Sequence, residues 1–430
     1  MPWTIFLTLA GSITTAIYYD KYRTRQVKQK WCDAVSHLAT ETLPSHALPR
    51  KLTIYLAAPP GDGLRIAREH FHEYIKPVLV AAAMDWDVVE GRKEGDVRFK
   101  TAERIRRKRR RAGEGTGVVA EDDVEEEDKA AALKMLREKN GTLEWEGVNG
   151  DLVVGRHTWK EYVRGVHEGW LGPADAPKVL ETSAEGGTPA SDGQETIPTV
   201  DSPVHSSLVD AASATAVEVL TPAPDQMATS TSDSSDTTPE IIPESTPEEK
   251  PEEKPKPRQP PPYVTPLDYP SAALPRSLPE ILGPAATVRF PHILGFFNTF
   301  TRTRRFFNRR QLADDVGREV AGAVLASHRS FATVAGTAHR SELDSSESTR
   351  AGENVPEQVE VLVREERDWL KSVWGERKEH EESLLKEAVV VDDRIGSRMR
   401  IFELSAENEA RAKRIGDGVE KVAKAGEEES

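Results

Sequence analysis

Residues 3–19 form an apolar run, WTIFLTLAGSITTAIYY, that contains no charged residue. A helix that crosses a bilayer needs roughly 17 to 25 mostly apolar residues, so this run is just long enough. Trp3 at one end and Tyr18 and Tyr19 at the other are rings that favour the membrane–water boundary. Basic residues follow the run, whereas they would precede the core of a signal peptide. We therefore predict a retained transmembrane anchor over residues 1–20, with a cleaved signal peptide or a buried globular helix as alternatives.

Small residues occupy one face of this predicted anchor. Gly11 and Thr15 are four residues apart, with Ala10 and Thr14 beside them. Small side chains let two membrane helices approach closely. We therefore predict a membrane-helix packing site at Gly11 and Thr15.

Positive charge follows the anchor, at Lys21, Arg23, Arg25, Lys28 and Lys30. The positive-inside rule alone would place the C-terminal bulk of the chain on the negative side of the membrane. The rule compares the basic residues on the two flanks of a span. Here it carries little weight, because no N-terminal flank precedes the anchor and Asp20 lies between the anchor and the basic residues.

Apolar residues keep helical spacing beyond the anchor. The residues on this face are Val27, Trp31, Ala34, Val35 and Leu38. Pro44 and Pro49 end the pattern. Residues 21–50 are therefore expected to hold a juxtamembrane helix.

The order strand, helix, strand marks the beginning of a folded body. Residues 52–57 form a short apolar strand, residues 64–82 keep a helical face, and residues 86–90 suit a second strand. This order predicts a right-handed parallel βαβ unit and an α/β fold. Pro77 lies within the helical pattern, so we expect a kink or a break there.

The first part of the body, residues 51–180, ends in a turn and a helix. Residues 142–146 and 152–154 are predicted as two strands around the turn at Asn149-Gly150. Thr158 and Glu161 have the spacing of a capping box for a helix that ends near residue 169.

A helix predicted over residues 95–112 carries the basic block RIRRKRRR at residues 104–111, and an acidic run follows at residues 121–128. Such a block is typical of nuclear-import and nucleic-acid sites, and it also suits an anionic lipid surface. No aromatic residue for base stacking is interleaved with the arginines. We favour a solvated helix end that the acidic run neutralises.

Residues 181–262 consist mainly of Ser, Thr, Pro, Glu and Ala. Such a segment cannot bury enough apolar surface to offset the entropy lost on ordering, so we predict a disordered insert. Its proline-rich end is typical of a stiff spacer, with an SH3-like partner as the alternative. A second polar insert is predicted over residues 337–353.

The second part of the body, residues 263–405, is predicted to be mainly helical. Its segment TRTRRFFNRR at residues 301–310 combines aromatic and basic residues and suits a negatively charged partner surface. We favour the alternative, in which the phenylalanines are core residues with arginines at the rim. These phenylalanines are Phe296, Phe297, Phe306 and Phe307.

Two amphipathic helices are predicted in this second part, one over residues 311–328 and one beyond Pro356. The apolar face of the later helix includes Val359, Leu362, Val363, Leu370, Val373 and Trp374. Residues 389–391 suit a short buried strand or a turn of helix. The acidic tail, residues 406–430, is expected to be helical at most.

Composition narrows the classes of function. Charged residues make up 30% of the chain and aromatic residues only 6%, which indicates that much of it is not packed in a core. A net charge of -14 argues against a dedicated nucleic-acid binder. The single cysteine, Cys32, excludes an internal disulfide and a thiolate metal cluster.

The loop at residues 59–63 is the one candidate for phosphate binding, because it lies between a strand and a helix N-terminus. It matches neither dinucleotide-binding nor P-loop patterns. Its spacing is loosely similar to that of diacylglycerol-type lipid kinases, whose second glycine-rich loop has only Val148-Asn149-Gly150-Asp151 as a counterpart here. His70, His72, His157 and His167 are poorly spaced for a metal site. We therefore predict no catalytic residue, cofactor or metal.

Several ordered segments together resemble the family of the fungal mitochondrial inner-membrane translocase subunit fifty-four. The resemblance covers most of residues 3–180 and 263–405. The segments are YYDKYRTRQVKQKWCDAVSHLA, LPRKLTIYLAAPPGDGL, EYIKPVLVAAAMDWDVVEGRKEGDVR, WEGVNGDLVVGRHTWKEYVRGVHEGWLGP, LGFFNTFTRTRRFFNRRQLADDVGREVAGAVLA and DDRIGSRMRIFEL.

The resemblance implies a single-span inner-membrane protein with its bulk in the intermembrane space. It implies a non-catalytic scaffold subunit of the carrier translocase, the Tim twenty-two complex, which inserts polytopic carrier proteins. The implied partners are the channel subunit, small intermembrane-space chaperones, inner-membrane lipid and, indirectly, carrier precursors, but no nucleic acid. Members of the family usually have residues ahead of the anchor, so a start at Met1-Pro2 predicts an incomplete or different N-terminus.

The rival hypothesis from another class is a membrane-anchored lipid or nucleotide-binding enzyme. It would use the loop Gly61-Asp62-Gly63, since a helix N-terminus there favours an anion.

Overall fold

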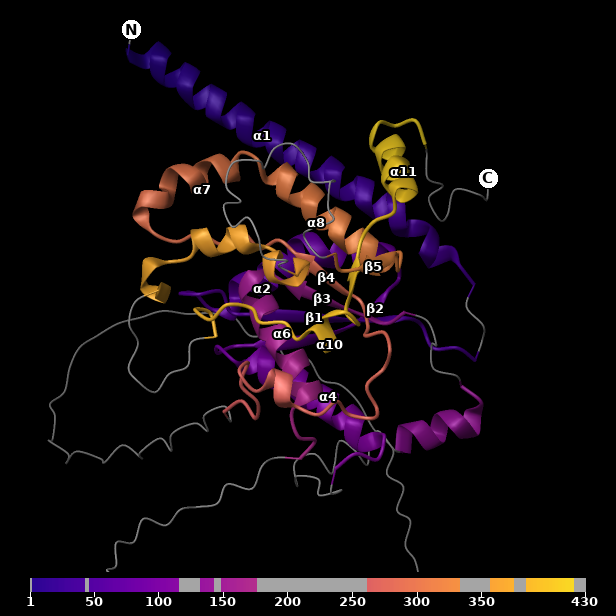
Figure 1. The fold of residues 1–430 in the computed structure, drawn as a ribbon. Helices are drawn as coiled ribbons and strands as arrows, with labels where there is room; N and C mark the ends of the chain where they lie inside the picture. Colours follow the sequence, from indigo (N-terminus) through magenta and orange to yellow (C-terminus); the bar gives the residue numbers. More distant parts are fainter. Residues whose placement is uncertain are drawn as a thin grey trace, which may run out of the picture. The chain divides into compact units, whose positions relative to one another are not determined.

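A six-stranded sheet with the order β2-β1-β3-β4-β6-β5 lies at the centre of the body (Figure 1). The computed structural model describes residues 2–42, 46–115, 132–142, 148–175, 261–332, 356–374 and 384–420, which belong to one unit formed by residues 1–178 and 258–430. All neighbouring strands are parallel except β5 and β6. The strands are β1 (Lys51–Ala57), β2 (Asp85–Gly91), β3 (Gly150–Val154), β4 (Ala285–Val288), β5 (His328–Ser330) and β6 (Arg400–Phe402).

Strand β1 is buried on both faces, as its nearly continuous apolar sequence requires. Leu52, Ile54 and Leu56 belong to the core on one side of the sheet. Tyr55 and Ala57 belong to the core on the other side. Alternate residues of a strand point to opposite faces, so one apolar segment supplies both layers. The prediction of an α/β fold that begins with a parallel βαβ unit is confirmed.

Helices cover both faces of the sheet. The first layer holds α1 (Pro2–Val35), α2 (Leu64–His70), the π-helical turn η2 (Phe71–Ile75), α3 (Lys76–Ala81) and α8 (Arg309–Val324). The second layer holds α4 (Asp96–Arg111) and α6 (Arg156–Leu171). The shorter elements are η1 (Ser36–Thr40), η3 (Tyr269–Ser271), η4 (Phe296–Asn298), α7 (Thr299–Phe306), α9 (Glu357–Glu360), η6 (Val363–Asp368), η7 (Lys371–Trp374), α10 (Asp393–Gly396) and α11 (Ala406–Gly416).

Helix α1 runs without a break through both the predicted anchor and the predicted juxtamembrane helix. In its C-terminal half, Trp31, Ala34 and Val35 are buried in the first core layer, as their spacing predicts. Its N-terminal half is exposed. The prediction of a spanning helix is met only in its secondary structure, because no helix among the described residues combines the length and the apolarity of a membrane span. The hydroxyl residues of the run, such as Thr8 and Ser12, lower its apolarity.

The predicted break at Pro77 takes the form of a π-helical turn. Residues 71–75 adopt π-helical geometry immediately before Pro77, which is at the beginning of α3. Proline donates no N–H and crowds the preceding turn, so the ladder of helical hydrogen bonds must adjust there. The helix resumes after the adjustment and ends at Ala81.

The capping box predicted at Thr158 and Glu161 is wrong. Helix α6 begins at Arg156, and the Thr158 hydroxyl has no hydrogen-bond partner in the described structure. Glu161 instead accepts hydrogen bonds from the backbone N–H groups of Val97 (3.0 Å) and Arg98 (3.4 Å). It therefore caps the N-terminus of α4, a neighbouring helix, and burial raises its pKa to about 7.

The amphipathic helix predicted beyond Pro356 is also wrong. The chain forms three short helical pieces, α9, η6 and η7, and Leu362 interrupts them with a φ of 56°. The break lets Glu365 reach the body, where it accepts hydrogen bonds from the backbone N–H groups of Arg156 (2.8 Å) and Phe290 (2.7 Å). Residues 389–391 form neither a strand nor a helix turn, although Val389 is buried.

Several predictions fall on residues that the structure does not describe. These are the acidic run at residues 121–128, most of the strand at residues 142–146, the insert at residues 181–260 and the insert at residues 337–353. The amphipathic helix predicted over residues 311–328 is confirmed by α8, and the beginning of the acidic tail forms α11.

Candidate functional site

The loop at residues 59–63 joins β1 to α2, but its surroundings do not suit a phosphate. A Cβ atom on Gly61 would lie 2.6 Å from the Leu370 side chain, so leucine covers the loop at this point. The Asp62 carboxylate accepts a hydrogen bond from the Gly63 N–H at 2.7 Å and lies 3.6 Å from His292 Nε2. The helix N-terminus is therefore already next to a negative charge, which would repel a phosphate.

The two glycine motifs of the lipid-kinase hypothesis lie at opposite ends of the parallel strands. Gly61 follows the C-terminal end of β1, whereas Gly150 begins β3 and pairs with Leu52 near the start of β1. Leu52 and Ala57 are five residues apart along the strand, which is about 16 Å. The motifs therefore cannot form one phosphate site.

A cavity of about 560 Å³ lies against the second face of the sheet, beside the N-terminal ends of β1 and β3. In its wall, the Tyr162 hydroxyl donates a hydrogen bond to Asp151 at 2.8 Å, and Arg104 donates to the Tyr55 hydroxyl at 3.0 Å. Burial raises the pKa of both tyrosines, so they remain neutral donors and acceptors. Ligands of open parallel sheets normally bind at the opposite, C-terminal ends of the strands.

Three of the four histidines considered for a metal site, His70, His157 and His167, are buried in the fold and stay uncharged. His157 Nε2 lies 3.1 Å from the Ala57 carbonyl, and His167 Nδ1 lies 2.8 Å from the Val163 carbonyl. His70 is buried while His72 is exposed, so the two point to different faces as expected. Burial lowers the pKa of His70, His157 and His167 to about 4 in each case. Nowhere in the described segments do three possible metal ligands come together.

The basic block at residues 104–111 is only partly a solvated helix end, because Arg104, Lys108 and Arg111 are exposed whereas Arg106 and Arg109 are buried. Arg106 is 1% exposed, and its Nη2 lies 2.7 Å from Oε1 of Glu168 on α6. Arg98, about two turns earlier on the same helix, donates to the other carboxylate oxygen of Glu168. One carboxylate therefore pairs with two buried guanidinium groups between α4 and α6.

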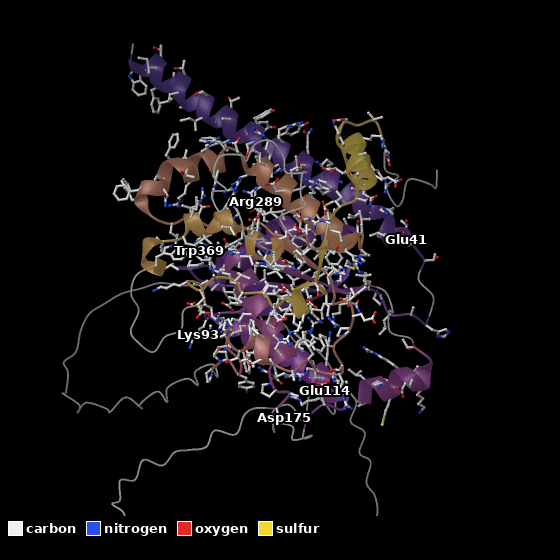
Figure 2. The ribbon with its side chains drawn as sticks, in the orientation of Figure 1. Glu41, Lys93, Glu114, Asp175, Arg289 and Trp369 are labelled. Carbon is white, nitrogen blue, oxygen red and sulfur yellow. The ribbon has the colours of Figure 1, made fainter. Side chains whose placement is uncertain are left out.

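Arg109 stabilises the same helix pair one turn further along α4, at the C-terminal end of α6. Its Nη1 donates to the carbonyl oxygens of Gly169 (2.7 Å) and Gly172 (2.6 Å), at the C-terminus of α6. Its Nε donates to Glu114 at 2.8 Å, and Figure 2 shows Glu114 and Asp175 at this end of the pair. A cation at a helix C-terminus satisfies carbonyl groups that the helix leaves unpaired. These contacts remove Arg106 and Arg109 from any nucleic-acid surface.

The predicted packing site at Gly11 and Thr15 lies on an open surface of α1. The Thr15 hydroxyl donates to the Gly11 carbonyl at 2.8 Å, and a Cβ atom on Gly11 would meet nothing within 4 Å. Large apolar side chains surround this face and are exposed. They are Trp3, Ile5, Phe6, Leu7, Leu9, Ile13, Ile17, Tyr18 and Tyr19. We call residues 3–19 the apolar end of α1.

Asp20 marks the point where the apolar end of α1 meets the body. This residue is 3% exposed and accepts hydrogen bonds from the Arg309 N–H (3.1 Å) and from Arg310 Nη1 (3.2 Å). The Arg310 guanidinium also lies 5.7 Å from the centre of the Tyr19 ring. Sequence reasoning treated Asp20 only as a charge beside the membrane, because its partners are almost 300 residues away.

The phenylalanines before and within α7 are not core residues, so that interpretation is wrong for this segment. Phe296, Phe297 and Phe300 are 86%, 98% and 82% exposed, and Phe306 is also exposed. The alternative, an aromatic and basic surface, agrees with the structure.

Comparisons with known proteins cover nearly the whole chain. The family model "Inner membrane protein import complex subunit Tim54" matches residues 1–402. An Aspergillus oryzae protein, "Mitochondrial import inner membrane translocase subunit tim54", is 45% identical over 429 residues, which are 98% of this chain and 88% of that protein. A Neurospora crassa protein of the same name is 44% identical over 422 residues, 96% of this chain and 79% of that protein. A Debaryomyces hansenii protein, "Mitochondrial import inner membrane translocase subunit TIM54", is 27% identical over 463 residues, 94% of this chain and 87% of that protein.

Proposed function

Because this chain belongs to the Tim54 family of inner membrane protein import complex subunits, we propose that it is the scaffold subunit of the carrier translocase. It is a mitochondrial inner-membrane protein that takes part in protein transport as a translocase subunit. In our proposal it supports the insertion of polytopic carrier proteins and holds small intermembrane-space chaperones near the channel. The family match over residues 1–402 is the observation that carries this proposal.

A non-catalytic role agrees with how the candidate chemical groups are used. Glu161 and Glu168 hold α4 and α6 together, and His157 and His167 contact backbone carbonyls. The loop with Asp62 lacks a cation for phosphate among its described contacts. These groups stabilise the body, so in our proposal the protein acts through its binding surfaces.

In the same proposal, the apolar end of α1 crosses the inner membrane once, with the bulk in the intermembrane space. The positive-inside rule has less weight here than the sequence suggests, because part of the positive charge belongs to the body. Lys28 pairs with Glu73 at 3.2 Å, and Lys30 pairs with Asp314 at 2.5 Å. Gly11 and Thr15 then face the channel subunit in the membrane, where small residues allow close packing.

The test is to tag the C-terminus, solubilise mitochondria in a mild detergent and identify the copurifying proteins by mass spectrometry. Recovery of the channel subunit and the small chaperones is expected. A clean preparation without either of them would contradict the scaffold role. Protease added after rupture of the outer membrane should remove the C-terminal tag, whereas a protected tag would contradict the proposed topology.

A variant with Gly11→Leu and Thr15→Leu tests the packing site, since bulky side chains would keep another helix at a distance. We expect a smaller complex on native gels. The matched control is Leu9→Ile with Ile13→Leu, which changes the same helix without changing side-chain volume. An unchanged complex with the bulky pair would remove the packing site from the proposal.

A further inference from the structure

We propose that residues 295–306, which comprise η4 and α7, form a second membrane contact that lies on the surface of an anionic bilayer. We call these residues the aromatic–basic segment. Phe296, Phe297 and Phe300 would enter the boundary between headgroups and acyl chains. Arg302 and Arg304 would bind lipid phosphates. This inference rests on the proposed membrane location of the apolar end of α1.

The exposed phenylalanines and two of the arginines in this segment are not explained by contacts with the described body. Phe297 is 98% exposed, and an aromatic side chain normally contributes to stability by leaving water. Three large apolar side chains grouped on one exposed turn mark an interaction surface more than three scattered ones would. Within the described residues, neither Arg302 nor Arg304 makes a side-chain hydrogen bond or an ion pair, and both are exposed. Arg304 lies four residues after Phe300, so the two share one face of α7.

The charge of the segment differs from that of the chain as a whole. Residues 293–313 contain five arginines and no acidic residue, whereas the chain has a net charge of -14. The other three arginines contact this chain, because Arg305 pairs with Asp368 at 2.8 Å, Arg310 pairs with Asp20, and the Arg309 guanidinium lies 4.8 Å from the centre of the Phe306 ring. Of these five arginines, the two without an ion pair to a described residue therefore lie beside the exposed phenylalanines. This combination is typical of helices that lie in the interface of anionic membranes.

The segment is connected directly to the point where the apolar end of α1 leaves the body. Helix α7 ends at Phe306, three residues before Arg309, whose N–H binds Asp20. Tyr18 and Tyr19 immediately precede Asp20, so the segment is held near the two rings expected at the membrane–water boundary. Figure 1 shows α7 and the N-terminal half of α1 on the same side of the view. A bilayer that holds the apolar end of α1 would therefore meet the aromatic–basic segment too.

The chain offers a direct probe, because Cys32 is its only cysteine. In a Cys32→Ser background, Phe297→Cys is labelled with an environment-sensitive nitrobenzoxadiazole dye. The purified full chain is then reconstituted into phosphatidylcholine vesicles, either pure or with roughly a third phosphatidylglycerol. The matched control is Leu267→Cys, since Leu267 is an equally exposed apolar residue (91%) outside the segment.

We expect the dye at position 297 to shift to shorter wavelengths and to be quenched by brominated acyl chains in the anionic vesicles. The dye at position 267 should show neither change. Arg302→Glu with Arg304→Glu should abolish the response at position 297, while flotation of the chain with vesicles stays unchanged because it depends on the apolar end of α1.

Three outcomes would overturn the inference. If the chain floats but the dye at position 297 stays in water, the segment does not contact lipid, although the proposed membrane crossing survives. If the chain does not float with either vesicle, both proposals fail. If the dye responds to added RNA and not to vesicles, the segment binds nucleic acid instead.

Discussion

Helices α4 and α7 are both rich in arginine, yet their arginines lie in opposite environments. On α4, Arg106 and Arg109 are buried and bind Glu168, Glu114 and backbone carbonyls of α6. On α7, Arg302 and Arg304 are exposed beside exposed phenylalanines. The difference comes from the neighbouring elements, because α6 brings a carboxylate against α4. Arginine content alone therefore does not distinguish a structural helix from an interaction surface.

The largest expected effect comes from removing Glu168, the carboxylate on α6 that two arginines of α4 share. Glu168→Gln removes the carboxylate that both Arg98 and Arg106 bind and leaves Arg106 only the longer pair with Glu103 at 3.7 Å among its described ion pairs, so we expect the free energy of unfolding to fall by about 3–5 kcal/mol. Denaturant unfolding of the full chain in detergent, followed by tryptophan fluorescence, measures this loss. The control is Glu409→Gln, which removes the exposed pair with Arg318 and should cost about 0–1 kcal/mol. Equal losses in the two variants would contradict the internal role of the basic block.

The cap that Glu161 provides to α4 should be pH-dependent. Burial raises its pKa to about 7 from its ordinary value of 4.5, so between these values the folded protein holds a proton that the unfolded chain has released. This group therefore contributes stability that is lost as pH rises through that range. The glutamine of Glu161→Gln cannot titrate. As pH rises from 4.5 to 7, we therefore expect the free energy of unfolding of the variant to increase relative to that of the unaltered protein, by up to about 1.4 kcal/mol per pH unit.

Denaturant unfolding of both proteins in parallel, over about three pH units from pH 5 to pH 8, measures this difference. The three buried histidines titrate in both proteins, so their contribution cancels. A constant difference across the range would show that Glu161 does not hold a proton in the folded protein.

The position of α7 beside α1 depends on Asp20, which binds Arg309 and Arg310 just after α7. Asp20→Ala removes the acceptor for the Arg309 N–H and the partner of Arg310, and we expect a loss of about 1–3 kcal/mol. The junction of α7 and α8 should also separate from α1, so limited proteolysis should cut near residue 308 earlier than in the unaltered protein. Asp33→Ala, a change further along α1, is the control that should leave this cleavage unchanged.

The smallest effect on folding is expected at the exposed arginines of α7. Arg302→Glu with Arg304→Glu should change the free energy of unfolding by less than about 0.5 kcal/mol, because exposed side chains without partners contribute little to stability. The same denaturant experiment measures it. A loss comparable to that of Glu168→Gln would show that α7 is structural after all.

The parts of the fold that were predicted correctly depend on local apolar patterns. Strand β1, helix α8 and the second half of α1 each repeat apolar residues at the period of their own element. The errors concern polar residues whose partners are distant in sequence. Glu161 has the spacing of a local cap, but it binds Val97 and Arg98 on another helix.

The candidate site was predicted only in outline. The apolar end of α1 and its small residues are visible as a sequence pattern, and the aromatic and basic composition of residues 301–310 was recognised as a possible partner surface. Its phenylalanines were assigned to the core because large apolar residues are usually buried. No sequence signal showed that the apolar core is complete without Phe297.

The sequence by itself determined the family of this protein, its α/β class and the uncharged run at its N-terminus, because these follow from residue order and local periodicity. Only the tertiary structure decided which charges are internal and which are free. Arg106 and Glu168 are 62 residues apart, and Arg309 and Asp20 are 289 residues apart. A charge is stabilised by whatever the fold brings within a few ångströms, and sequence distance carries no information about such a contact.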